Sequence, residues 1–202
     1  MNETLKITGV ILAGGQGRRM GEKDKGLIEL DGLPLISHIT NSLQSQCNKL
    51  LINANRNKAR YSQYGYDVIS DEESGFQGPL AGMAAAMKYT DDDWIITVPC
   101  DGPYVATDYV ARMRNALQRD GADIAVARDE QRLQPVYALI RVSLLPDLEV
   151  FLKAGERKIE RWFRQHKLVE VDFIDSALMF ENFNTPEQLQ AYHDQTPDAL
   201  ND

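Results

Sequence analysis

Short apolar runs alternate with longer amphipathic stretches along most of the chain. The short runs are rich in isoleucine, valine and leucine, which is typical of parallel strands covered on both faces. This alternation predicts an α/β protein with a mostly parallel central sheet flanked by helices. We expect strands near residues 9–13, 49–53, 67–69, 94–98 and 123–127, and helices near residues 34–46, 57–64, 80–89, 107–119, 143–153, 158–165 and 186–193.

The last third of the chain changes character. Residues 132–140 and 169–173 are expected to be strands that extend or decorate the sheet, with a turn at Asp129 and Glu130. No repeat, proline-rich linker or low-complexity tract divides the sequence, and 202 residues, 43% of them hydrophobic, suffice for one core. We therefore expect a single domain over residues 1–194 and a flexible acidic tail over residues 195–202.

The segment after the first predicted strand combines glycines with positive charge. Glycines let backbone N–H groups approach a phosphate closely, and cationic side chains neutralise it. A Walker A loop does not fit, because no lysine-hydroxyl pair follows the glycines. The dinucleotide pattern does not fit either, because a pattern begun at Gly15 meets Met20 where glycine is required. The segment instead predicts a loop for a nucleoside triphosphate. Its glycines and cations are Gly14, Gly15, Gly17, Arg18, Arg19, Lys23 and Lys25.

Polar residues follow the first four predicted strands. These strands end in Gly14, in Asn53 and Asn55, in Asp71 and in Asp101. Ligands of open α/β sheets bind beyond such carboxyl ends. Asp101 follows an apolar run, so its carboxylate should project to where a triphosphate would lie. Because Mg²⁺ needs only one or two carboxylates besides phosphate oxygens and water, Asp101 is the predicted metal ligand.

The order of these motifs resembles that of the molybdenum cofactor guanylyltransferases, a family of Rossmann-like nucleotidyltransferases. The match begins at Leu12, Ala13, Gly14 and Gly15 and includes Asp24, where relatives that act on sugar phosphates usually have proline. It continues through residues 53–55, 71, 78–82, 99–101, 155–157 and 182–186. The resemblance implies a three-layer Rossmann-like fold of the nucleotide-diphospho-sugar transferase type. Residues 1–105 would form the nucleotide-binding part, and residues 106–194 the acceptor-binding part.

The resemblance also implies a reaction and a role for each matched residue. GMP would pass from GTP to molybdenum-bound molybdopterin, releasing pyrophosphate. The catalytic residues would be Arg19, Lys25 and Asp101, with Mg²⁺ or Mn²⁺ on Asp101. The nucleotide would also contact Leu12, Ala13, Gly14, Gly15, Asn53, Asp71, Gly78, Pro79 and Leu80. The acceptor would contact Arg157, Lys158, Asn182 and Asn184.

The base-reading residues leave alternatives open. Guanine presents N1–H and N2–H₂ as adjacent donors beside the acceptor O6. An oxygen of Asp71 or Asn53 could accept from these donors, and a backbone N–H of residues 78–82 could meet O6. A cytidylyltransferase acting on molybdopterin or another phosphorylated acceptor would keep the loop and Asp101. A non-catalytic GTP-binding regulator is a third reading, weakened by Asp101 because a pure binder has less need of a metal ligand.

The composition excludes several classes of binding partner. Twenty-two basic and thirty acidic residues give a net charge of −8, which argues against nucleic acid and anionic membranes. Cys47 and Cys100 form no disulfide or metal pattern, and the first residues lack a targeting pattern. No apolar segment approaches the roughly 20 residues that span a bilayer. We expect a cytoplasmic protein that binds GTP and the molybdenum-bound pterin, with transient contacts to cofactor-biosynthesis or molybdoenzyme-chaperone proteins.

Overall fold

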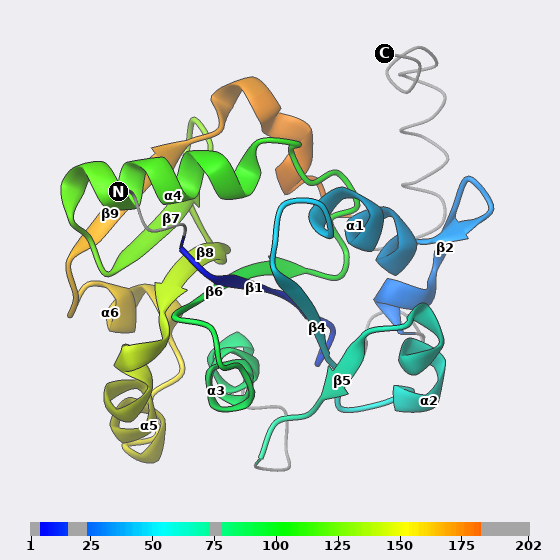
Figure 1. Cartoon of the computed structure of the whole chain (residues 1–202), viewed down its shortest axis with the longest axis horizontal. Coiled ribbons are helices and arrows are strands. Elements are labelled where there is room, and N and C mark those ends of the chain that lie inside the picture. Colours follow the sequence, from blue (N-terminus) through cyan, green and yellow to red (C-terminus); the bar gives the residue numbers. More distant parts are fainter. Residues whose placement is uncertain (1–4, 16–23, 73–77, 183–202) are drawn as a thin grey trace.

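One sheet of seven strands runs through the protein (Figure 1). The computed structural model describes residues 5–15, 24–72 and 78–182. The strand order is β5-β4-β1-β6-β8-β7-β9. The first four in this order are parallel neighbours: β5 (Asp67–Ile69), β4 (Lys49–Asn53), β1 (Ile7–Leu12) and β6 (Trp94–Pro99). The other three strands are β8 (Leu133–Arg141), β7 (Ile124–Arg128) and β9 (Leu168–Asp172). Strand β8 is antiparallel to β6 and to β7, and β9 is parallel to β7.

Helices cover both faces of the sheet (Figure 1). One face carries α1 (Leu35–Leu43), α2 (Lys58–Tyr61) and α4 (Tyr109–Asp120). The opposite face carries α3 (Pro79–Tyr89), α5 (Leu145–Lys153) and α6 (Ile159–Phe163). Two hydrophobic cores result, one on each side of the sheet. The predicted three-layer Rossmann-like α/β fold is thus confirmed.

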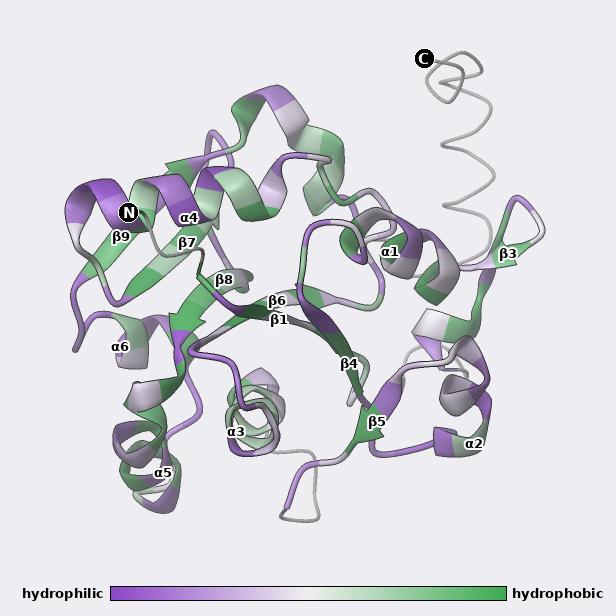
Figure 2. Ribbon diagram, viewed as in Figure 1, coloured by the Kyte–Doolittle hydropathy of each residue, from purple (hydrophilic) through white to green (hydrophobic). Residues whose placement is uncertain are grey.

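Alternation along the strands supplies both cores. Ile7 and Ile11 of β1 face the core under α1 and α4, whereas Val10 faces the core under α3. The central strands are accordingly largely hydrophobic, while the helices carry both polar and apolar sides (Figure 2). Met83 and Met87, four residues apart in α3, are both buried in the core on the other face.

All seven predicted strands exist, with bounds within two residues of expectation. The turn predicted at Asp129 and Glu130 joins β7 to β8. The helix predicted at 57–64 is shorter, because α2 passes into a 3-10 turn, η3 (Ser62–Tyr64). The helix predicted at 34–46 ends early, at Leu43, and Gln46 turns its side-chain amide to Ala106 O. The helix predicted at 186–193 and the tail at 195–202 lie outside the described residues.

Several short elements had no counterpart in the sequence-based prediction. They are η2 (Lys25–Leu27), a hairpin of β2 (Glu29–Leu30) and β3 (Leu33–Pro34), η4 (Val142–Leu144) and η5 (Ile174–Phe180). Each is too short for a hydrophobic period to develop, except η5, which is irregular at Ser176. Within the described part of the chain, no helix has the length and apolar character needed to cross a membrane.

Candidate functional site

The carboxyl ends of the four parallel strands meet at one edge of the sheet. Beyond β1, the Ala13 N–H donates to Asn53 O at 2.8 Å, and on the other side the Cys100 N–H donates to Leu12 O at 3.2 Å. The backbone after β1 therefore runs between the ends of β4 and β6. A Cβ on Gly15 would have nothing within 4 Å. This strip, residues 12–15, offers backbone to a ligand at the place where the sequence predicted a phosphate cradle.

Two amides hold a carboxylate on the β4 side of the strip. The Asn53 Nδ2 donates to Asp71 Oδ1 at 3.0 Å, and the Asn55 Nδ2 donates to Asp71 Oδ2 at 2.8 Å. The Asp71 N–H in turn donates to Asn55 Oδ1 at 3.0 Å. Each carboxylate oxygen has two lone pairs, so Asp71 can still accept from a ligand. Asn53 and Asp71 are thus brought together as expected, and Asn55 joins them although it was not predicted as a site residue.

The N-terminus of α3 packs against this cluster. Gly78 precedes the helix with φ of 82°, a left-handed conformation that favours glycine, and Pro79 takes the first helical position. A Cβ on Gly82 would lie closer than 3.0 Å to Asn53 Oδ1 and 2.9 Å from Leu12 Cδ2. Glycine thus allows the helix to approach the strand ends. Because the Leu80 side chain is fully buried, only its backbone could meet a nucleotide.

A cation and a carboxylate pair on the β6 side of the strip. Lys25 Nζ lies 2.7 Å from Asp101 Oδ2, with side-chain exposures of 28% and 16%. Asp101 lies two residues beyond β6, and Lys25 is the first residue of η2, so the partners are 76 positions apart in sequence. The two predicted catalytic residues within the described part of the chain are therefore in direct contact. Arg19, the third, lies outside the described residues.

The residues around Lys25 are fixed by α2 and by the end of β6. The buried Tyr61 hydroxyl donates to Asp24 Oδ1, and Asn57 Nδ2 donates to Asp24 Oδ2 at 3.2 Å. A Cβ on Gly26 would lie 2.6 Å from Tyr61 Oη and 3.2 Å from Cys100 Cβ. Asp24 is the residue that sets the resembled family apart in the sequence. Through these two hydrogen bonds it anchors the chain next to Lys25 to α2 and its N-cap.

Burial keeps the neighbouring thiol and phenol neutral. Desolvation, reinforced by Asp101, raises the pKa of Cys100 far above its usual value. Desolvation, reinforced by Cys100 and Asp24, likewise raises the pKa of Tyr61. Cys100 is therefore a poor nucleophile at neutral pH, because only a thiolate attacks readily. Tyr61 acts as a hydrogen-bond donor rather than as a base.

A divalent metal would find the carboxylate of Asp101 here. Among the described residues, no group of three or more histidine, cysteine, aspartate or glutamate side chains could enclose a metal ion. Asp101 nevertheless offers hard oxygen ligands at the sheet edge. Mg²⁺ commonly takes one or two carboxylates and completes its shell with phosphate oxygens and water. The donor chemistry therefore fits a metal that arrives with a polyphosphate, as the sequence predicted for Asp101.

Two of the predicted acceptor residues, Arg157 and Lys158, lie in the segment between α5 and α6. Arg157 Nη1 donates to Leu152 O at 2.8 Å and to Glu156 O at 2.7 Å, so the guanidinium satisfies carbonyls at the end of α5. Arg157 also lines a pocket of about 170 Å³ between α3 and α5. Lys158 lines a second pocket of about 550 Å³ with Arg161 and Arg164. Asn182 follows η5, and Asn184 lies outside the described residues.

Comparison with known proteins places this arrangement in a family. The family model of the MobA-like NTP transferase domain matches residues 9–171. This chain belongs to the MobA-like NTP transferase family. It is 51% identical over 185 residues to a molybdenum cofactor guanylyltransferase of Shewanella frigidimarina, covering 92% of this chain and 94% of the relative. A protein of the same name from Shewanella halifaxensis is 49% identical, covering 93% and 94% of the two chains. The predicted resemblance and the nucleotidyltransferase class are confirmed.

Several solved structures share the fold of this chain. Molybdopterin-guanine dinucleotide biosynthesis protein A from Archaeoglobus fulgidus superposes with a TM-score of 0.77 at 23% identity, covering 94% of this chain and 98% of that one. A 4-diphosphocytidyl-2C-methyl-D-erythritol synthase from Anaerococcus prevotii gives a TM-score of 0.72 at 12% identity, covering 96% of each chain. At these identities the likeness concerns the fold alone.

Proposed function

We propose that this protein transfers GMP from GTP to molybdenum-bound molybdopterin and releases pyrophosphate. One observation carries the proposal. The strip at residues 12–15 separates a hydrogen-bonded group, Asn53, Asn55 and Asp71, from the ion pair of Lys25 and Asp101. A nucleoside triphosphate laid along the strip would have its base at the first group and its phosphates at the second. The names of the relatives support guanine as the base and the molybdenum cofactor as the acceptor.

The chemistry demands charge stabilisation rather than a general base. The second pKa of a phosphate monoester is about 6, so the acceptor phosphate is mostly dianionic at pH 7 and can attack directly. The neutral Cys100 and Tyr61 fit a direct transfer without a covalent intermediate. The enzyme must instead bring two polyanions together and stabilise the charge on the departing pyrophosphate.

Lys25 and Asp101 meet this demand with opposite charges. In the proposed complex, the Lys25 ammonium turns from Asp101 to the triphosphate oxygens, and Arg19 adds a second cation to them. The backbone N–H groups at residues 12–15 bind the phosphates, and Asp101 holds Mg²⁺ or Mn²⁺ through its carboxylate. When bound, the metal neutralises phosphate charge and stabilises the leaving group. The hydrogen bond from the Tyr61 hydroxyl to Asp24 holds the backbone next to Lys25, so that Lys25 stays close to Asp101.

Guanine selection is assigned to Asp71. Its carboxylate would accept from guanine N1–H and N2–H₂, while Asn53 and Asn55 hold it in place. The backbone of Gly78, Pro79 and Leu80 at the start of α3 would face the rest of the nucleotide. A cytosine ring lacks these two adjacent donors. CTP should therefore be a poor substrate.

The acceptor side is assigned to Arg157, Lys158, Asn182 and Asn184. Lys158 has basic neighbours, Arg161 and Arg164, around the pocket of about 550 Å³. Such a basic setting suits an acceptor that carries a phosphate. We further infer a cytoplasmic location and transient contacts with the proteins that make the cofactor or receive it.

Pyrophosphate release from GTP, CTP, ATP and ITP, each with and without molybdenum-bound molybdopterin, tests the proposal. We expect release that requires the acceptor and prefers GTP. Equal use of CTP would reassign the protein to the cytidylyltransferases. GTP binding measured by calorimetry, with no release in the presence of acceptor, would identify a GTP-binding regulator instead.

A further inference from the structure

The residue after Asp101 touches the segment that leads to Asn182. A Cβ on Gly102 would lie closer than 3.0 Å to Tyr137 Oη and 3.4 Å from Met179 O. The Tyr137 hydroxyl itself donates to Met179 O at 2.6 Å, and both residues are buried. Three stretches of chain that are far apart in sequence therefore meet at one hydroxyl group. One of them begins at the predicted metal ligand, and another ends at a predicted acceptor contact.

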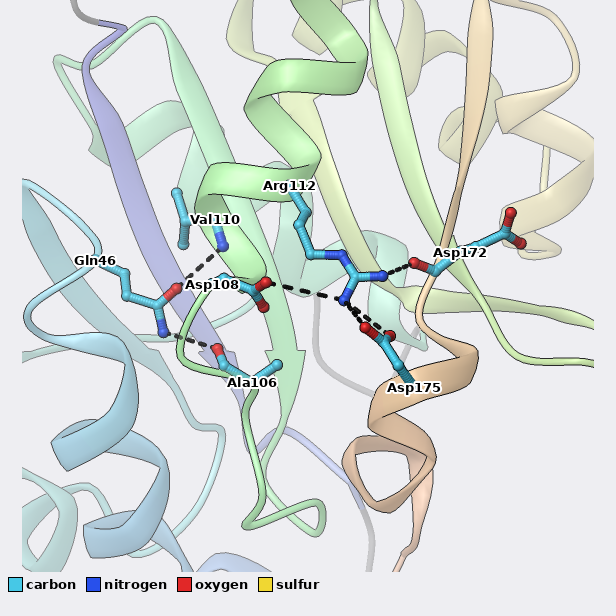
Figure 3. A network of polar contacts seen from close by, with 7 residues as sticks. All are labelled: Gln46, Ala106, Asp108, Val110, Arg112, Asp172 and Asp175. Atoms are coloured by element: carbon cyan, nitrogen blue, oxygen red, sulfur yellow. Dashed lines mark hydrogen bonds and ion pairs between the residues drawn. The ribbon is translucent and has the colours of Figure 1, made fainter. Parts of the chain in front are cut away.

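The segment η5 is held against the rest of the protein at both of its ends. At its start, Arg112 Nη1 donates to both oxygens of Asp175, at 2.9 and 3.0 Å, and Arg112 Nη2 donates to Asp172 O (Figure 3). The Arg112 guanidinium also lies 4.1 Å from the centre of the Phe173 ring. Arg112 belongs to α4, so this contact ties the start of the segment to the helix layer.

The other end of η5 is held by Tyr137. Its ring meets the Phe180 ring edge-on at 5.2 Å between centroids, and its hydroxyl holds the carbonyl of Met179. Phe180 and Met179 are the last residues of η5, and Asn182 follows two positions later. Tyr137 lies on β8, which pairs with β6, the strand that ends beside Asp101. The hydroxyl therefore joins the metal-binding side of the site to the proposed acceptor wall.

We propose that Tyr137 is a positioning residue that fixes Asn182 relative to Asp101 for attack by the acceptor phosphate. The inference rests on the proposed function, because it takes Asn182 as part of the acceptor wall. Transfer requires the acceptor phosphate and the GTP phosphate to stand within bonding reach, and small misplacements lower the rate strongly. A buried hydroxyl that donates to the Met179 carbonyl limits the movement of the end of η5, and the position of Asn182 depends on that end.

The chain offers a matched control. Tyr109 is buried in the same aromatic cluster, with its ring centroid 6.2 Å from that of Tyr137, and its hydroxyl donates to Thr97 O at 3.0 Å. Tyr137→Phe and Tyr109→Phe each remove one buried hydroxyl that donates to one carbonyl. Only the first of these hydroxyls bonds to the segment before Asn182. A purely structural contribution should therefore be similar in the two variants.

The first experiment compares Tyr137→Phe, Tyr109→Phe and Asn182→Ala in the full chain. We expect Tyr137→Phe to raise KM for molybdenum-bound molybdopterin about 5- to 20-fold, the scale of one lost buried hydrogen bond. Its GTP affinity, measured by calorimetry, should stay within about twofold of the parent, because the Tyr137 hydroxyl is not proposed to contact GTP. Tyr109→Phe should leave both quantities within about twofold. An unchanged acceptor KM in Tyr137→Phe, or the same rise in Tyr109→Phe, would overturn the inference.

The Asn182→Ala variant shows whether a negative result concerns the positioning role of Tyr137 or the proposed function itself. If Asn182→Ala raises the acceptor KM and Tyr137→Phe does not, the acceptor wall stands and the positioning role is wrong. If Asn182→Ala has no effect while GTP-dependent transfer persists, the acceptor wall is wrong and the role of Tyr137 falls with it. Loss of acceptor-dependent pyrophosphate release in the parent protein would instead refute the proposed function.

A suppressor test adds a second readout. Gly102→Ala should lower kcat at least tenfold, because its new methyl group meets the Tyr137 hydroxyl beside Asp101. In Gly102→Ala/Tyr137→Phe that hydroxyl is gone, and the nearest remaining atoms would lie at 3.4 and 3.6 Å, which are ordinary contacts. The double variant should therefore recover much of the lost kcat. A double variant no faster than Gly102→Ala would contradict the proposed contact.

Discussion

The two halves of the sheet carry functional residues in different ways. In the half formed by β5, β4, β1 and β6, three candidate residues lie at the end of a parallel strand or two residues beyond it: Asn53, Asp71 and Asp101. Asn53 bonds to Asp71, and Lys25 bonds to Asp101. In the half formed by β8, β7 and β9, the candidate residues sit beyond short helices. Arg157 there bonds to the backbone at the end of α5.

The two halves differ in what holds their candidate residues in place. Strand ends in a parallel sheet are fixed by the strand hydrogen bonds, so a nucleotide bound there, as proposed, would meet a preformed surface. On the proposed acceptor side, individual side chains such as Arg112 and Tyr137 bond to the segment η5 and hold it in place. We therefore expect substitutions in the first half to remove chemistry or base selection. Substitutions in the second half should weaken acceptor binding and cost some stability.

The largest effect is expected for Asp101→Asn. The substitution keeps the side-chain shape but removes the charge that pairs with Lys25 and that, in the proposed function, would bind the metal. Turnover should fall by about 10²-fold or more, the scale of a lost electrostatic contact at a reacting centre. Asp67→Asn is the control, since Asp67 also pairs with a lysine, Lys49, at 3.1 Å, but lies in the edge strand β5. Near-parental turnover of Asp101→Asn at saturating Mg²⁺ would contradict the metal assignment.

Lys25→Ala should come next. The ammonium would face several phosphate charges in a partly buried site, so its loss should weaken GTP binding by about 1–3 kcal/mol. Calorimetry with GTP measures this directly, and Lys49→Ala supplies an exposed ion-pair control. Arg19→Ala is expected to behave like Lys25→Ala. If both variants keep the parental kcat and KM, the segment around them is not a triphosphate loop.

Base selection provides a smaller and more specific effect. ITP lacks the N2 amine of GTP, so it should bind more weakly by one hydrogen bond to a charged group, about 1.5–3 kcal/mol. Asn55→Ala removes one amide that holds Asp71, and it should narrow the difference between GTP and ITP. The exposed Asn41→Ala in α1 should preserve that difference. Equal affinity for GTP and ITP in the parent protein would remove Asp71 as the base reader.

The smallest effect is expected in the acceptor half. Arg157→Ala should raise KM for the acceptor and leave GTP affinity intact, and it should also lower the melting temperature. The stability loss should be about 1–2 kcal/mol, because two carbonyls near the end of α5 lose a charged donor. Lys158→Ala should affect acceptor use without this loss. Weaker GTP binding in Arg157→Ala would move Arg157 to the nucleotide side.

The convergence of the strand ends on one edge of the sheet was predictable from the sequence for a physical reason. Apolar runs mark buried strands, and parallel neighbours bring their carboxyl ends to one edge, so Asn53, Asp71 and Asp101 converge without any knowledge of side-chain contacts. The roles of Asn55 and Asp24 could not be read in this way. Both depend on hydrogen bonds between residues 16 and 37 positions apart, which leave no periodic signal.

The acceptor half was less predictable. The resemblance placed Arg157 in the acceptor wall, but its contacts with the end of α5 become visible only when α5 and the turn after it are folded. The segment η5 lacks both strand alternation and helical spacing, so its place beside Tyr137 had no signature in the sequence. The roles of Arg157, Lys158 and Asn182 and the division near residue 105 stay predictions, as do the roles of the residues on the nucleotide side.

The pairing of β6 with β8 has a consequence for anyone who wishes to recombine these enzymes. Exchanging the donor and acceptor halves between relatives by a crossover near residue 105 would place β6 and β8 in fragments of different ancestry, although they share four residue pairs. A poorly matched pair would leave hydrophobic strand edges open to intermolecular association. Chimaeras should therefore precipitate more readily than proteins in which only the few strand-end side chains are exchanged, and grafting those side chains is the sounder route to a new donor nucleotide.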